Sequence, residues 1–386
     1  MPDPSRLALA AAAGIGIILW APLADRARAA IRTLADANFA AAVAAIVIGA
    51  ILLALVAAVV RIRRRPATPA ASRLAPAAPP DTSRPAVRYL LLALAVAIGV
   101  VYAQVTSTGS PDVDAVERFH FVEYGLLTWL CYRAWLPAGD RSTLIAPVLA
   151  ALLVGTLDEW VQWLIPYRVG EARDVLLNGA AIACGMLFSV AVEPPSPSSG
   201  LRPGSRAWLS GLAAAAWMTF FLFFSSVQVG YEIESAAHGR FLSTLSRPAL
   251  AAATQDRTER WRGMTAPMLA KRFSIEDRYL TEGLWHAQRR NALLGAGQLA
   301  PAWSEHRIVE EFYGALLDRP TTDSPGGHRL PPEQEAAARA AHAEAGTDGY
   351  VSTAHPFPLY PWPKWILHVL ALGGSVVIAG IGIIRR

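Results

Sequence analysis

Residues 142–178 read STLIAPVLAALLVGTLDEWVQWLIPYRVGEARDVLLN. The apolar run at 142–157 is typical of a membrane interior, yet it leads directly into a charged segment. A charge at the centre of a bilayer costs roughly 2.5–3.5 kcal/mol on insertion scales. Because Pro166 interrupts the chain between two apolar segments, we predict a charged turn at the membrane boundary with a span on each side.

The composition of the whole chain favours a membrane protein. It has 386 residues, of which 53% are hydrophobic and 17% charged, and a mean hydropathy of +0.32. A helix needs about 20 apolar residues to cross a bilayer. The segments that qualify are 7–23, 39–60, 88–105, 118–137, 142–160, 173–192, 207–228 and 364–383. We therefore predict an all-α, polytopic transmembrane helical bundle of about eight spans.

The net charge of +5 reflects arginines beside the spans. Basic residues next to spans orient a membrane protein, so they indicate a lipid bilayer as partner and no nucleic acid. With the RIRRR at 61–65 in the cytoplasm, alternation of the spans places residues 229–362 outside it. The Ala27-Arg28-Ala29 after the first span imitates a signal-peptidase site, but we expect an uncleaved anchor.

Composition divides the chain into spans, linkers and one long segment without a span. The Pro-rich and Ala-rich stretch after the basic cluster is typical of a flexible linker. The predicted parts are a transmembrane pair (1–65), a cytoplasmic linker (66–87), a three-span unit (88–192), a linker (193–206), a span (207–228), an extracytoplasmic domain (229–362) and a last span (363–386).

The extracytoplasmic domain is expected to be small and mainly helical. Helices are predicted at 271–290, 304–318 and 331–345, and no strand alternation is evident. In the second helix an amphipathic stripe should pack against a partner; it comprises Ile308, Val309, Phe312, Tyr313, Leu316 and Leu317. The histidines of this domain lack ligand spacing, so we expect solvated side chains.

Polar residues gather at the same end of three consecutive spans. His120, Glu123 and Tyr124 are spaced i, i+3 and i+4 on one helical face. DEWVQ (158–162) ends the next span, and RDVLLNG (173–179) begins the one after it. The alternation of spans brings these groups to one membrane depth, where ionisable residues indicate function.

The candidate chemistry is acid–base catalysis or binding of a charged group. The proposed catalytic residues are His120, Glu123, Asp158, Glu159 and Asp174, with His120 as the general base. The proposed substrate-binding residues are Tyr124, Gln162, Arg168 and Asn178, with Arg168 suited to phosphate or carboxylate. A divalent cation is a candidate ligand of the carboxylates. The alternative is structural: the same groups would hydrogen-bond across helices and fix their packing.

The motifs H-F-x-E-Y, D-E-x-x-Q, P-x-R, D-x-x-x-N and a later Gly resemble the VanZ-like membrane proteins. The matching residues are His120, Phe121, Glu123, Tyr124, Asp158, Glu159, Gln162, Pro166, Arg168, Asp174, Asn178 and Gly185. The chain departs from the family at Glu117, Val161, Tyr167 and Glu171, where the family often has Lys, His, Gly and Ser. The missing second His weakens a metal site.

The resemblance implies a multi-pass protein of the bacterial inner membrane, linked in the family's namesake to tolerance of a glycopeptide antibiotic. The outward-facing cluster of acidic residues with one His and one Arg suggests a site for a lipid-linked or cell-wall-related molecule that bears phosphate or carboxylate. The alternative is a scaffold or sensor whose 229–362 domain binds an envelope partner. A transporter is disfavoured because neither midplane charges nor internal repeats are evident.

Overall fold

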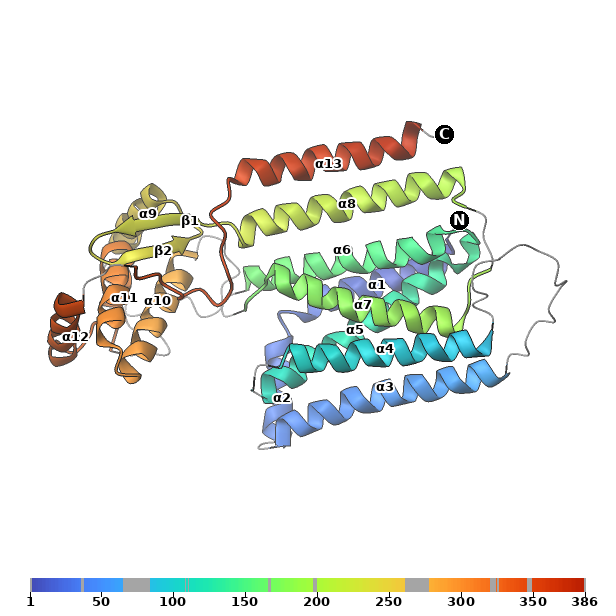
Figure 1. The fold of residues 1–386 in the computed structure, drawn as a ribbon, viewed down its shortest axis with the longest axis horizontal. Coiled ribbons are helices and arrows are strands. Elements are labelled where there is room, and N and C mark those ends of the chain that lie inside the picture. Colours follow the sequence, from blue (N-terminus) through green and yellow to red (C-terminus); the bar gives the residue numbers. More distant parts are fainter. Residues whose placement is uncertain are drawn as a thin grey trace. The chain divides into compact units, whose positions relative to one another are not determined.

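The computed structural model describes residues 2–35, 38–64, 84–107, 109, 111–165, 168–196, 200–260, 278–319, 324, 326–345 and 349–384. These residues form two compact units (Figure 1). The first unit comprises Met1–Glu159, Ala172–Leu222 and Val369–Arg386. The second comprises Trp160–Glu171 and Phe223–His368.

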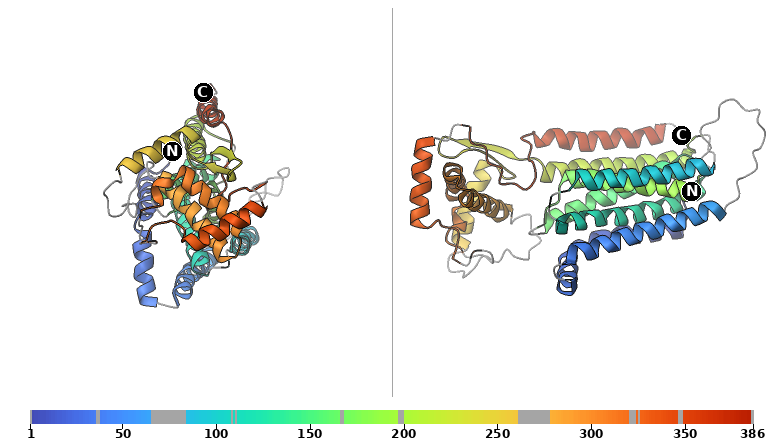
Figure 2. Two further views of the ribbon diagram at one scale, coloured as in Figure 1. Left: turned by 90° about the vertical axis from the view of Figure 1, so that its left-hand side faces the viewer. Right: turned by 60° about the horizontal axis from the view of Figure 1, so that its bottom comes forward.

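Long helices lying side by side dominate the first unit (Figures 1 and 2). The helical elements in chain order are α1 (Pro4–Trp20), α2 (Ala24–Ala35), α3 (Phe39–Arg64), α4 (Pro85–Val105), α5 (Pro111–Trp135), the 3-10 turn η2 (Leu136–Ala138), α6 (Ser142–Leu164), α7 (Ala172–Val192), α8 (Pro203–Val227) and α13 (Lys364–Ile384), of which α2 is short and lies across the others. Each predicted span falls largely on one of these helices, so the helical membrane bundle is confirmed.

Six helices in the described part of the chain are long and apolar enough to cross a bilayer: α3, α4, α6, α7, α8 and α13 as far as Gly382. The other two expected spans fall on α1, which has only 17 residues, and on α5. The 25 residues of α5 include the charged members of the candidate site, which lowers its hydropathy.

Side chains form hydrogen bonds with backbone groups that have no partner within the helix at two helix ends. At the start of α1, the Asp3 carboxylate accepts hydrogen bonds from the backbone N–H groups of Ser5 and Arg6, at 3.0 and 3.3 Å. At the end of α7, the buried Arg88 donates to the carbonyls of Ala191 and Val192, at 2.6 and 3.0 Å. An arginine that we assigned only to membrane orientation therefore also caps a helix.

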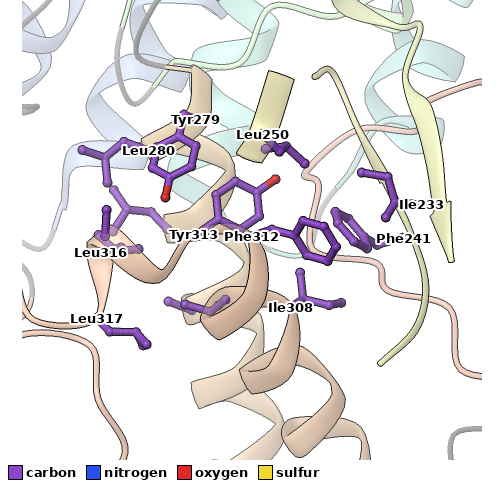
Figure 3. Close-up of a cluster of buried hydrophobic side chains, with 14 residues drawn as sticks. Ile233, Phe241, Leu250, Tyr279, Leu280, Ile308, Phe312, Tyr313, Leu316 and Leu317 are labelled. Atoms are coloured by element: carbon purple, nitrogen blue, oxygen red, sulfur yellow. The ribbon is translucent and has the colours of Figure 1, made fainter. Parts of the chain in front are cut away.

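The second unit is a small helical domain with one β-hairpin. Its strands β1 (Tyr231–Ser235) and β2 (Gly239–Ser243) pair antiparallel, with Ile233 opposite Phe241. Its helical elements are α9 (Arg247–Arg260), α10 (Arg278–Gly295), α11 (Leu299–Phe312), the 3-10 turn η4 (Gly314–Leu316) and α12 (Pro332–Ala345). Figure 3 shows the core that all of these elements except α12 share, in which Ile233, Phe241, Leu250 and Tyr313 converge.

Helices α10 and α12 confirm two predicted helices where the structure describes them, and residues 271–277 lie outside that part. The helix predicted at 304–318 instead ends at Phe312 in α11 and is followed by the turn η4. The predicted stripe of α11 and η4 is buried throughout, from Ile308 at 0% to Leu317 at 4% exposure. The absence of strands was wrong for residues 231–243. Each strand has five residues and alternates only around Ile233 or Phe241, which is too short a pattern to recognise.

The expectation of solvated histidines was also wrong. His238, His286, His306 and His328 are all at most 7% exposed. His286 Nδ1 lies 2.6 Å from Glu305 Oε2, inside the domain. Burial favours a raised pKa for Glu305, but the charge of His286 and hydrogen bonds from His286, Ser352 and Tyr350 outweigh it and lower the pKa.

A second buried carboxylate lies close by on α10. Glu282 accepts hydrogen bonds from the Ser243 and Tyr313 hydroxyls, at 2.6 and 2.8 Å, and from the Thr244 backbone N–H at 2.9 Å. Burial alone would raise the pKa of Glu282, yet the nearby His355 and these donors together lower it. The domain therefore encloses ionised groups that several donors stabilise.

Candidate functional site

The predicted residues of α5 form the partly exposed edge of the site. His120 Nδ1 lies 3.5 Å from Glu123 Oε2, and their side chains are 26% and 17% exposed. The imidazole also stacks on the Tyr124 ring, with centroids 5.9 Å apart. The spacing of i, i+3 and i+4 thus places all three side chains together, as expected from the helical period.

The Tyr124 hydroxyl connects this edge to α6. It donates a hydrogen bond to Asp158 Oδ2 at 3.0 Å, and the two residues are 0% and 3% exposed. Glu159 beside Asp158 is 1% exposed. A buried carboxylate needs hydrogen-bond donors or opposite charge, and Tyr124 supplies one such donor. The partly exposed His120 and Glu123 therefore lie next to the buried carboxylates of Asp158 and Glu159.

The first turns of α7 contribute Asp174 and Asn178 to the site. Asn178 is 2% exposed and lies against the backbone of Gly155 in α6. A Cβ at Gly155 would lie 3.3 Å from Tyr124 Cε1 and 3.5 Å from Asn178 Nδ2. The missing side chain of Gly155 thus lets helices α5, α6 and α7 meet at one point. Asp174 lies in the first turn of α7, where the helix dipole favours a carboxylate.

One further glycine of the motif serves helix packing. A Cβ at Gly185 would lie 2.9 Å from both the Cα and the carbonyl oxygen of Gly125. Helices α5 and α7 therefore approach to backbone contact at this point. This close approach holds Tyr124 and Asn178 at the same level of the bundle, so Gly185 supports the site without belonging to it.

Two residues that we did not predict belong to the cluster. Tyr102 at the end of α4 is 7% exposed, and its ring packs edge-on against Phe121 with centroids 4.4 Å apart. The charges of Glu117, Glu159 and Asp174 act on its hydroxyl. Glu117 itself precedes His120 by three residues. The spacing on α5 could have indicated Glu117, whereas nothing in the sequence singles out Tyr102.

Gln162 and Arg168 fall in the second unit. Arg168 Nη2 donates to Gln162 Oε1 at 2.7 Å, just after the end of α6. This contact orients the guanidinium and satisfies the amide. The remaining predicted site residues all belong to the first unit. Pro166 and Tyr167 lie outside the described residues.

The geometry gives no support to a bound cation. Within the described ranges, no group of three or more His, Cys, Asp or Glu side chains is arranged to hold a metal ion. The arrangement suits proton transfer and hydrogen bonding better. His120 at the edge can exchange a proton with a ligand, while Tyr124 links its ring to the buried Asp158.

The fold and this cluster define a polytopic helical membrane protein with polar groups buried between its helices. Residues 16–193 match the family model described as VanZ/LLP1. This range is thus similar to VanZ-like proteins and is less than half of the chain. It holds every predicted site residue and leaves the second unit's β-hairpin and following helices outside the match. Comparison with curated proteins and with solved structures found no match.

Proposed function

We propose that this VanZ-like protein binds or acts on a lipid-linked or cell-wall-related molecule at the outer leaflet of a bacterial inner membrane. The observation that carries the proposal is the buried Tyr124–Asp158 hydrogen bond beneath the partly exposed His120 and Glu123. Ionisable groups gathered in a partly buried cluster are candidates for acid–base chemistry or ligand recognition. Tolerance of glycopeptide antibiotics is the cellular role that the family suggests.

In this proposal His120 is the general base, and Glu123, Asp158, Glu159 and Asp174 hold its orientation and charge. Tyr124 and Asn178 contact the ligand. Arg168, in the second unit, is proposed to bind a phosphate or carboxylate, and its hydrogen bond to Gln162 fixes the guanidinium plane for that role. The distribution of arginines along the chain supports an outward-facing site.

Profiling of lipids and cell-wall precursors in cells that lack the protein tests this function. Complementation with wild type should restore the precursor pattern, and His120→Ala should not restore it. The matched control is His342→Ala on α12, which should restore it fully because this residue lies far along the chain from the VanZ-like range. If His120→Ala, present at the normal protein level, fully restored the precursor pattern, the proposal would be wrong.

A scaffold or sensor is the second candidate function. The observation that favours it is the enclosed core of the second unit, in which Glu282 and Glu305 are fully satisfied by neighbouring donors. Such a core suits a stable binding module for an envelope partner. Deletion of 229–362 should then abolish the cellular phenotype while the His120→Ala protein stays active, and the opposite pattern would exclude this candidate.

A further inference from the structure

Aromatic side chains gather in the second unit at the ends of two helices that can cross a bilayer. Residues 223–227 at the end of α8 and residues 364–368 at the start of α13 both belong to this unit. Both helices are long and apolar enough to span a membrane. The aromatic patch comprises the side chains of Phe224, Tyr231, Tyr360, Trp362 and Trp365.

Backbone hydrogen bonds hold the two chain segments of the patch together. The Tyr360 N–H donates to the Gln228 carbonyl at 2.8 Å, and the Gly230 N–H donates to the Tyr360 carbonyl at 3.1 Å. The chain that leads into α13 is therefore fixed against the residues that follow α8. The Phe224, Tyr360 and Trp362 rings stack on one another, with centroids 5.0–5.9 Å apart and interplanar angles of 18–28°.

The patch faces away from the core of the unit. Phe357 and Leu359, just before it in the chain, are only 4% and 7% exposed, so they anchor the segment in the domain. In contrast, Tyr231, Trp362 and Trp365 are 43%, 51% and 66% exposed. A cluster of large exposed apolar side chains marks an interaction surface.

The exposed face of α13 indicates what covers the patch. Trp365, Val369, Leu372 and Val376 are spaced i, i+4, i+7 and i+11, so they share one helical face, and each is 59–72% exposed. An apolar face of this kind on a membrane span contacts lipid. Trp365 is thus the first residue of a lipid-facing surface. Lys364 Nζ lies 5.4 Å from the centroid of the Tyr231 ring, and such a long basic side chain suits the boundary with water.

We propose that the aromatic patch inserts into the headgroup layer of the bilayer and holds the β-hairpin of the second unit at the membrane surface. Indole and phenol rings combine a large apolar body with a polar tip, so they favour this layer over both water and hydrocarbon. The partner is the lipid surface itself, independent of a particular headgroup. The patch lies outside the VanZ-like range, and its test does not depend on the proposed function.

Electron paramagnetic resonance of the full chain in phosphatidylcholine nanodiscs tests this contact. A nitroxide is attached at Pro361→Cys, next to Trp362, in a chain whose Cys131 and Cys184 are replaced by alanine. Collisions with oxygen, which concentrates in hydrocarbon, are compared with those of a nickel chelate, which stays in water. The reference is a label at Glu344→Cys on the exposed side of α12. The label at 361 should collide several-fold less with the nickel chelate than this reference, and more with oxygen.

Variants of the two exposed tryptophans show whether the rings make this contact. Trp362→Ser/Trp365→Ser should raise the nickel collisions at 361 several-fold, because serine has no preference for the headgroup layer. Trp362→Tyr/Trp365→Tyr is the matched control and should keep them low. An unchanged spectrum of the label at 344 shows that the unit stays folded in both variants.

Three results would overturn the proposal. Equal nickel collisions at 361 and 344 in the otherwise unchanged chain would mean that the patch faces water. Few collisions with both reagents at 361 would mean that protein, such as a second copy of the chain, covers it. Low nickel collisions that persist in the double serine variant would mean that the tryptophans do not hold the patch in the headgroup layer.

Discussion

At the scale of single residues, the hydrogen bond from Tyr124 to Asp158 is the best-defined element of the site. Both residues are buried, so a lost donor is not replaced by bulk water. We expect Tyr124→Phe to lower the free energy of unfolding by about 1–2 kcal/mol, because the ring is kept and the carboxylate loses one donor. Denaturant titration of the purified protein in detergent micelles measures this change.

The control for this prediction is Tyr89→Phe on α4, where the side chain is 37% exposed and the same change should have little effect. A double-mutant cycle with Asp158→Ala isolates the pair. The two single changes should not add, since each removes the same hydrogen bond. Strict additivity would show that the bond contributes nothing to stability.

The residue scale also shows how far sequence reasoning can reach. His120, Glu123 and Tyr124 could be placed on one face because the helical period fixes their relation within α5. Tyr102 could not be placed, since it reaches the cluster only through the packing of α4 on α7. The histidines of the second unit were misjudged for the same reason. A polar residue on a helix indicates solvent unless its tertiary partner, such as Glu305 for His286, is known.

At the scale of helices, the contact between α5 and α7 at Gly185 controls the geometry of the site. We expect Gly185→Ala to lower the free energy of unfolding by about 1–3 kcal/mol, because the added Cβ at 2.9 Å from Gly125 forces the two helices apart. Tyr124 and Asn178 would separate as a consequence. Activity in the complementation assay should therefore fall together with stability.

Gly179→Ala on the same helix is the matched control. Its Cβ would meet Leu152 Cδ2 at 4.0 Å, an ordinary van der Waals contact. Alanine also has a higher helix propensity than glycine, so this variant should be as stable as wild type or more stable. If both glycine replacements gave equal thermal unfolding temperatures, the close approach of α5 and α7 would not matter for stability.

Helices and strands could be predicted from the sequence where a hydrophobic pattern repeats over several turns, but not where the pattern spans only a few residues. The stripe from Ile308 to Leu317 continues over several turns, and it is buried as predicted. The hairpin at 231–243 offers only one buried apolar residue in each strand, so alternation was not visible. The order of the spans came from composition alone, since about 20 apolar residues are needed for each.

At the scale of the whole molecule, we expect the two units to differ in their response to acid. The second unit encloses His355, whose ring nitrogens are buried. Burial lowers its pKa to about 4, although Glu282, a backbone hydrogen bond with Leu242 and Glu305 favour the charged form. His286 opposes it with its own charge. The rings of Trp285 and Phe357 pack around it, with centroids 5.0 and 6.0 Å away.

We expect acid to destabilise the second unit before the first. Between pH 6.5 and about 4, the unfolded chain binds a proton at His355 while the folded domain excludes it, so stability falls as pH falls. The loss should approach about 3 kcal/mol at the lower limit. Glu282 and Glu305, whose pKa values are lowered, stabilise the fold until the pH falls below their ordinary range. The loss of stability from protonation of Glu282 and Glu305 therefore occurs at lower pH than the loss from His355.

Hydrogen exchange on the full chain, followed between pH 7 and 4, measures this response separately in each unit. After correction for the intrinsic pH dependence, amides of β1, β2 and α10 should lose protection as the pH falls, while those of α5 and α7 stay protected. His355→Phe keeps an aromatic ring among Trp285 and Phe357 but cannot bind a proton. Its second unit should keep its protection down to about pH 5. If this variant and wild type lost protection over the same pH range, His355 would not be the residue whose burial makes the domain acid-sensitive.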